Sequence, residues 1–205
     1  MESDDPLVVI SRYSEGAFGL GACAEDPRSA IAQWLAGHEA WIDSIGAHNL
    51  HAARLGFLAY IEVTFGDPQR AYDLATEAHA LSDSLGMDDR TLTIQVDRVR
   101  AQFLGAREPT DPNSDLQQVL REASKRRLGI CVRFALDVAS RMLDGKADDR
   151  VTRLCDEFGY VALPWGSRGD PSPPEVDAAR VEQSHGGLSV YDVADLAGRA
   201  LDELR

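Results

Sequence analysis

Apolar residues recur at helical spacing along most of this chain. Between residues 71 and 85 they recur mostly three or four positions apart, at Ala71, Leu74, Ala75, Ala78, Leu81 and Leu85. This spacing places them on one face of a helix and predicts a stripe that packs against neighbouring helices. No alternating run typical of a β-strand competes with it, so the pattern predicts an all-α fold.

Three of the apolar runs have the same start and the same end. The starts are the pairs Asp26-Pro27, Asp67-Pro68 and Asp111-Pro112, and the ends are Gly46, Gly86 and Gly129. The aspartate can cap the first-turn amides, proline suits the first helical position, and glycine ends a helix with a left-handed turn. Successive pairs are 41 and 44 residues apart. A period of about 40 residues is typical of an array of helical hairpins.

The residues between these runs supply the other half of each hairpin. Further helices are expected at 6–23, 47–65, 88–104 and 130–144, with a last half-hairpin after Asp148-Asp149. The first and second units place small residues four and eleven positions after the aspartate, where the third has Asp115 and Glu122. The packing of the third unit is therefore expected to differ. Residues 1–160 are predicted to form a helical repeat array of about three and a half hairpins.

The composition changes after this array. Residues 161–187 are rich in proline and glycine and include a further Asp-Pro pair at 170–171, so they are expected to be an irregular connection with a short helix near 174–184. Ser189 and Asp192 have the spacing of a capping box. Residues 188–205 are therefore expected to form a C-terminal capping helix.

Residues 55–86, LGFLAYIEVTFGDPQRAYDLATEAHALSDSLG, resemble a tetratricopeptide-type hairpin in their apolar-small pair, Gly-Asp turn and spaced alanines. Stretches 17–46 and 187–204 extend the likeness. The layout resembles the C-terminal helical region of bacterial multidomain ATPase-type transcription regulators. These are proteins related to the maltose regulator and to actinobacterial LuxR-type regulators, some of which carry nucleotide cyclase domains. The resemblance implies a stand-alone fragment of such a regulator.

Two features of those regulators are not found in this chain. The Gly145-Lys146 pair lacks the glycine and the hydroxyl residue of a phosphate-binding loop, and there is no room for a DNA-binding or cyclase domain. Neither ATP hydrolysis nor DNA binding is therefore expected. The net charge of −13 also argues against direct contact with nucleic acid.

Motifs that would indicate a cofactor, a metal or catalysis are lacking. Three scattered cysteines, an acidic N-terminus and the absence of a long apolar stretch predict a cytoplasmic protein that is not inserted in a membrane. His48 and His51 are too few for a metal site, and Cys131 and Cys155 lie in apolar patterns that favour buried thiols. The chain is predicted not to be an enzyme and to need no cofactor or metal. An unidentified enzyme is the last alternative.

Charged residues in the expected helix 88–104 suggest a binding surface. Asp97, Arg98 and Arg100 stand where the resembling proteins have apolar and small residues, so they should be paired or face a cavity. We expect them to lie beside Tyr60 in a concave groove. A second candidate is the basic run Lys125, Arg126 and Arg127, which is either a solvated helix face or a contact for an anion or an acidic partner.

These observations predict a non-catalytic protein-interaction module in bacterial signalling or transcription regulation. It would bind a protein partner, such as a regulator or a separate ATPase half, through its groove. The alternative is a sensor whose groove closes on a small-molecule effector. A thermal shift with a small molecule alone separates the two, because only the sensor gains stability from it.

Overall fold

The computed structural model describes residues 25–107, 110–159 and 182–204. Within these ranges it contains helices and no strand, which confirms the predicted all-α class. The helices are α2 (Pro27–Gly37), α3 (Glu39–Ile45), α4 (His48–Phe65), α5 (Pro68–Ser84), α6 (Asp88–Phe103), α7 (Pro112–Lys125), α8 (Gly129–Leu143), α9 (Asp149–Gly159) and α11 (Val190–Glu203). The expected helix at 6–23, the Asp-Pro pair at 170–171 and most of the expected connection lie outside the described residues.

The Asp-Pro pairs at 26–27, 67–68 and 111–112 start helices, as predicted. The side chain of Asp26 accepts a hydrogen bond from the amide of Ser29, and Asp67 and Asp111 each accept two from first-turn amides. Proline occupies the first turn each time, where its missing N–H costs nothing. The capping box is also present, because Ser189 and Asp192 each accept a hydrogen bond from the backbone amide of the other.

Two of the three predicted helix ends are confirmed and the third is wrong. Gly46 and Gly86 have left-handed φ angles of 63° and 66°. In the third unit the left-handed residue is Arg127, with φ of 58°, and Gly129 instead begins α8. The tyrosine of α11 supports this unusual turn, since the Tyr191 hydroxyl donates a hydrogen bond to the Arg127 carbonyl and the guanidinium lies 4.6 Å from the ring centre.

The first Asp-Pro run forms two helices instead of the single helix that was expected. The break falls at His38, which ends α2 and precedes α3. The ring nitrogen Nδ1 of His38 lies 2.7 Å from the carbonyl oxygen of Trp34, where it competes with the helical backbone. Gly37 before it weakens the helix further, because glycine has a low helix propensity.

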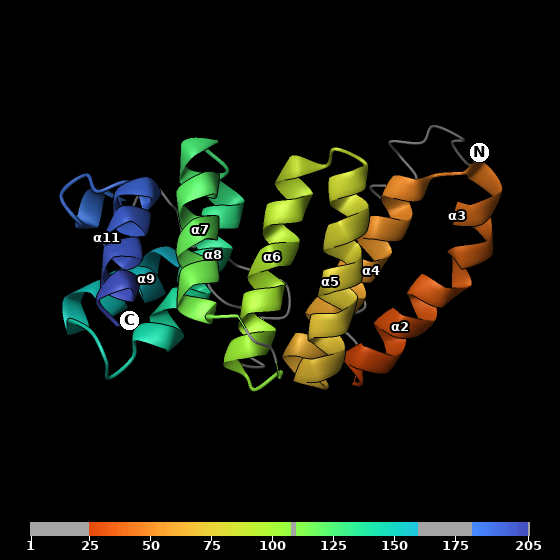
Figure 1. Cartoon of the computed structure of the whole chain (residues 1–205), viewed down its shortest axis with the longest axis horizontal. Coiled ribbons are helices and arrows are strands. Elements are labelled where there is room, and N and C mark those ends of the chain that lie inside the picture. The colour runs from red at the N-terminus through yellow and green to blue at the C-terminus, as the bar shows by residue number, and fades with distance from the viewer. Residues whose placement is uncertain (1–24, 108–109, 160–181, 205) are drawn as a thin grey trace.

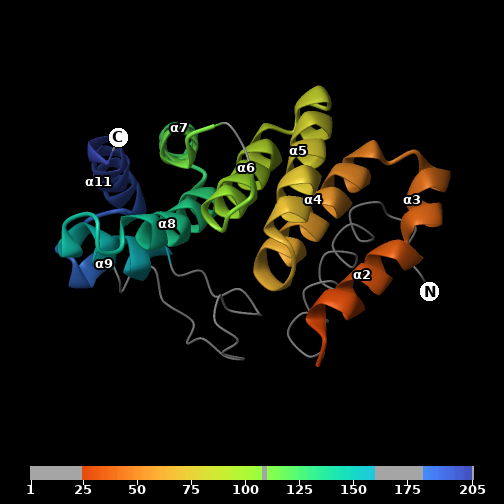
Figure 2. The same cartoon turned by 60° about the horizontal axis from the view of Figure 1, so that its bottom comes forward.

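The helices follow one another in a row, with α2 and α3 at one end and α11 at the other (Figure 1). Seen from a second direction, α4, α6 and α8 lie side by side, and α5 and α7 cover one side of them (Figure 2). Small residues allow this close packing. Ala71 and Ala78 on α5 are fully buried, and a Cβ atom added to Gly56 on α4 would meet Ile94 of α6 at 3.3 Å.

The apolar core is divided unequally along the row. The larger cluster of buried side chains comes from α6, α7, α8, α9 and α11, and α11 packs against α7, α8 and α9. A smaller cluster joins α2 and α3 to α4 through Ile31, Leu35, Ile42, Leu50 and Ile61. The larger part of the described core thus lies toward the α11 end of the row.

Candidate functional site

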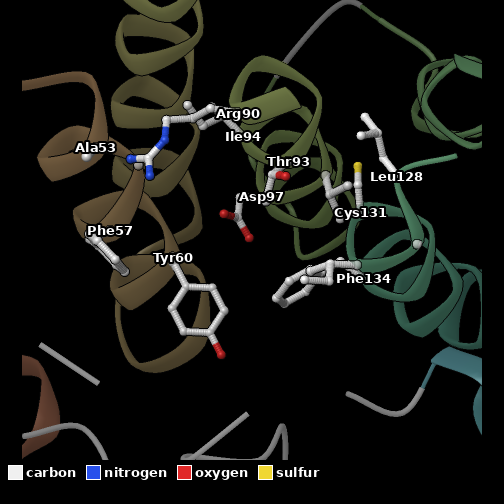
Figure 3. A pocket seen from close by; sticks show the side chains of 14 residues that line it. Ala53, Phe57, Tyr60, Arg90, Thr93, Ile94, Asp97, Leu128, Cys131 and Phe134 are labelled. Carbon is white, nitrogen blue, oxygen red and sulfur yellow. The ribbon is translucent and has the colours of Figure 1, made fainter. Parts of the chain in front are cut away.

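A cavity of about 570 Å³ opens between α4, α6 and α8 (Figure 3). Its lining is mainly apolar and includes three aromatic side chains. The residues that line it are Ala53, Gly56, Phe57, Tyr60, Arg90, Thr93, Ile94, Val96, Asp97, Leu128, Gly129, Ile130, Cys131 and Phe134. Ligand cavities commonly measure about 300–1,000 Å³ and combine apolar walls with a few polar groups. This cavity, here called the inner pocket, has both properties.

Helical periodicity explains how these side chains meet. On α4 the lining positions Ala53, Phe57 and Tyr60 are four and three residues apart, and on α6 Arg90 and Asp97 are separated by two turns. Residues at such spacings share one helix face. Because alternate helices of the row lie side by side, three such faces converge on one space.

Asp97 is the acidic group of the inner pocket. It is half-buried, and its carboxylate points into the cavity between the walls formed by α4 and α8 (Figure 3). Among the described residues it makes no hydrogen bond or ion pair. Burial raises the pKa of Asp97 to about 7, although the nearby charge of Arg100 opposes the shift. The carboxyl group is therefore poised to gain or lose its charge near neutral pH.

The four predicted groove residues do not all meet at this pocket. Tyr60 and Asp97 line it, whereas Arg98 and Arg100 do not. Successive residues of a helix point about 100° apart, so Arg98 faces the covering helices. Its Nη2 atom lies 3.9 Å from Asp115 of α7, and its guanidinium lies 5.8 Å from the ring centre of Tyr72 on α5.

Arg100 has a structural contact of its own. It is 9% exposed, and its Nη1 atom donates a hydrogen bond of 3.3 Å to the Thr64 hydroxyl of α4. Charged residues at these positions were expected either to be paired or to face a cavity, and neighbouring residues of α6 do so in different ways. The two arginines have partners on other helices, and the aspartate faces the cavity.

The basic run Lys125–Arg127 lies at the end of α7, and all three side chains are exposed. Cations at this position interact favourably with the carbonyl end of a helix. Arg127 also lies over Tyr191, which gives this side chain a structural partner. The run leads directly into Leu128 and Ile130 at the inner pocket.

Sequence reasoning missed several residues of the pocket. Phe57, Arg90, Thr93 and Phe134 were not singled out, nor was Ile130, whose side chain is 70% exposed. A signal for the first three was present, because they repeat the helical spacing of Tyr60 and Asp97 on the same two helices. Phe134 required the knowledge that α8 lies beside α6.

The structure places the candidate metal and thiol groups as follows. His51 lies 2.9 Å from Asp43, and the described residues contain no group of three or more potential metal ligands. Burial raises the pKa of the Cys155 thiol to about 12, with Asp156 adding to the shift, so this thiol stays protonated at neutral pH. Cys131 is also buried, at the wall of the inner pocket.

Comparison of the chain with models of known protein families, with curated proteins and with solved structures finds no match. Of the helices in the described ranges, none has the length and apolar character needed to cross a membrane.

Proposed function

We propose that this chain is a non-catalytic interaction module that binds a protein partner through the layer of α4, α6 and α8. The single observation that carries the proposal is Ile130, a large apolar side chain 70% exposed beside the inner pocket. An exposed apolar residue next to a cavity is a suitable anchor for an amphipathic partner segment. The basic run that precedes it would favour acidic residues around the partner's apolar anchor.

The sequence supplies the biological setting of this proposal. The resemblance to tetratricopeptide-like regions of bacterial regulators favours a role in signalling or transcription control, in the cytoplasm. The partner would then be another regulator or a separately encoded ATPase half. In such arrays alternate helices line a shared face, and α4, α6 and α8 alternate along this chain.

The experiment compares two substitutions of exposed isoleucines. Tagged wild-type protein, Ile130→Asp and Ile45→Asp are used for affinity purification from the native host. Ile45 is the matched control because it is 47% exposed but lies on α3, away from the inner pocket. We expect a protein that is retained by the wild type and by Ile45→Asp but lost with Ile130→Asp. A partner that is retained equally by all three would contradict the proposed surface.

The inner pocket itself favours a second candidate, a sensor of a small-molecule effector. Its volume of about 570 Å³ is that of a small-molecule site, and a partner's side chain alone would leave much of it empty. A ligand that bridges α4, α6 and α8 would stabilise their arrangement, and so raise the melting temperature. The ligand could then control partner binding on the same face.

A further inference from the structure

The walls of the inner pocket suit an apolar ligand that carries a charge. Phe57 and Tyr60 on α4 and Phe134 on α8 lie on opposite sides of Asp97 (Figure 3). Aromatic faces attract cations as well as apolar groups, since the ring carries negative charge density on its face. A carboxylate between aromatic walls is therefore a suitable environment for an organic cation.

We infer that the inner pocket binds a small organic ammonium ion, with the carboxylate of Asp97 as its counter-ion and the aromatic walls around its apolar body. The inference rests on the second of the two proposed functions and names its ligand class. An ammonium ion donates hydrogen bonds to a carboxylate that receives none from the described residues. A ligand anion would instead meet Asp97 and a chain whose net charge is −13.

Other titratable groups near Asp97 are compatible with such a ligand. On α6, the backbone position of Arg90 is two turns, about 10 Å along the helix axis, from that of Asp97, and its side chain also lines the pocket. Arg100 is held by Thr64 of α4. The remaining titratable groups of the lining are Tyr60 on α4 and Cys131 on α8, both ordinarily neutral at pH 7. Asp97 is thus the one acidic side chain among the lining residues.

The test uses three probes of similar size and different charge. These are the phenethylammonium ion, neutral 2-phenylethanol and the 3-phenylpropionate anion, each titrated into the full chain at pH 8. Binding is followed by calorimetry and by amide NMR shifts. We expect the ammonium ion to bind about 10- to 100-fold more tightly than the alcohol, which is the range of a charge-assisted hydrogen bond. The anion should bind most weakly, and the shifts should fall on α4, α6 and α8.

Two variants assign the effect to Asp97. Asp97→Asn keeps the shape of the side chain and should reduce ammonium binding to the level of the alcohol. Asp137→Asn is the matched control, because this half-buried carboxylate lies on α8 outside the pocket lining and pairs with Arg141 of the same helix. The control should bind the ammonium ion as the wild type does. Melting curves check that both variants are folded.

The pH dependence provides an independent measurement. Only the ionised carboxylate attracts the ammonium ion, and the pKa of Asp97 lies at about 7. Binding by the wild type should therefore weaken about tenfold from pH 8 to pH 6. Asp97→Asn should show no such change.

The outcomes separate this inference from the proposed partner binding. Equal affinity for the ammonium ion and the alcohol, or unchanged ammonium binding by Asp97→Asn, would overturn the inference. So would the absence of any binding at millimolar concentrations of the ammonium probe. None of these results affects a partner whose capture depends on Ile130, so failure of the ligand class and failure of the partner surface are distinguishable.

Discussion

At the scale of single residues, Gly159 shows how closely α8 and α9 approach. A Cβ atom at this position would lie 2.4 Å from the backbone nitrogen of Asp137 and 2.7 Å from the carbonyl carbon of Leu136. Both atoms belong to the backbone of a packed helix and cannot move away cheaply. Glycine is needed here to leave room for a neighbouring backbone, rather than to permit a turn.

Gly159→Ala is expected to lower the free energy of unfolding by about 1–3 kcal/mol, as overpacking of a close contact does. Denaturant titration measures the change. The control is Gly198→Ala on α11, where the nearest atom is 3.9 Å from an added Cβ atom. This change should be neutral or stabilise by up to about 1 kcal/mol, because alanine is the better helix former. Equal effects of both substitutions would contradict the close approach.

Asp97 predicts a pH dependence of stability. Its pKa rises from the ordinary value of 3.8 to about 7 in the folded protein, so between these values the folded state binds more protons than the unfolded state. Stability from this group is fully present below pH 3.8 and is lost as the pH rises through 7, by at most about 1.4 kcal/mol per pH unit.

We therefore expect Asp97→Asn to be more stable than the wild type at pH 8, and the difference to shrink toward pH 5. Thermal melts of both proteins across this range measure it, and Asp137→Asn is the control, because its carboxylate is also half-buried but pairs with Arg141. A difference between Asp97→Asn and the wild type that does not vary with pH would contradict the raised pKa.

At the scale of elements, a buried carboxylate attaches α2 to the rest of the row. The side chain of Glu62 on α4 is 8% exposed and accepts hydrogen bonds of 3.1 and 2.8 Å from Arg28 of α2. It also accepts one from the amide of Asp67 at the start of α5. One side chain thus joins the three elements α2, α4 and α5. Gly66 leaves space for it, because a Cβ atom there would lie 2.0 Å from the Glu62 carboxylate.

Glu62→Ala is expected to cost about 1.5–3 kcal/mol of stability, the range for hydrogen bonds to a charged group, and to loosen α2. Chemical denaturation measures the loss of stability, and amide hydrogen exchange in α2 measures how far this helix is loosened. Glu39→Ala is the control, since its contact with Arg54 is more exposed and should contribute less than about 1 kcal/mol. A loss no larger than that of the control would show that the carboxylate does not hold α2 in place.

At the scale of the whole molecule, the unequal core predicts unequal local stability. The cluster shared by α6, α7, α8, α9 and α11 is larger than the cluster that joins α2 and α3 to α4. Each helix of this row packs mainly against its neighbours, so the ends of the row can open without the rest. Hydrogen exchange should therefore be faster in α2 and α3 than in α7, α8 and α11. Uniform protection along the chain would indicate a single cooperative unit instead.

Much of the local structure could be predicted from the sequence. The starts of α2, α5, α7 and α11 follow from their capping residues, and the buried alanines of α5 follow from its spacing. The end of α7 could not, because Arg127 occupies a left-handed position that glycine would normally take. The hydroxyl and ring that support this turn belong to Tyr191, far away along the chain.

The candidate site, too, could be predicted from the sequence only in part. The sequence predicted that Asp97, Arg98 and Arg100 form a charged segment of α6. It did not predict which way each of the three side chains points. Only packing decided that Asp97 faces the inner pocket while Arg98 and Arg100 contact other helices. Phe134 and Ile130 became part of the site because α8 lies beside α6.

By itself, the sequence determined where the capped helices α2, α5, α7 and α11 begin and which alanines of α5 are buried. Caps, proline and helical spacing act within a few residues of one another, so their effects are visible in the chain. The tertiary structure alone decided that faces of α4, α6 and α8 enclose one cavity around Asp97. This depends on the rotation and spacing of helices that are distant in sequence, which the packing of the whole molecule sets.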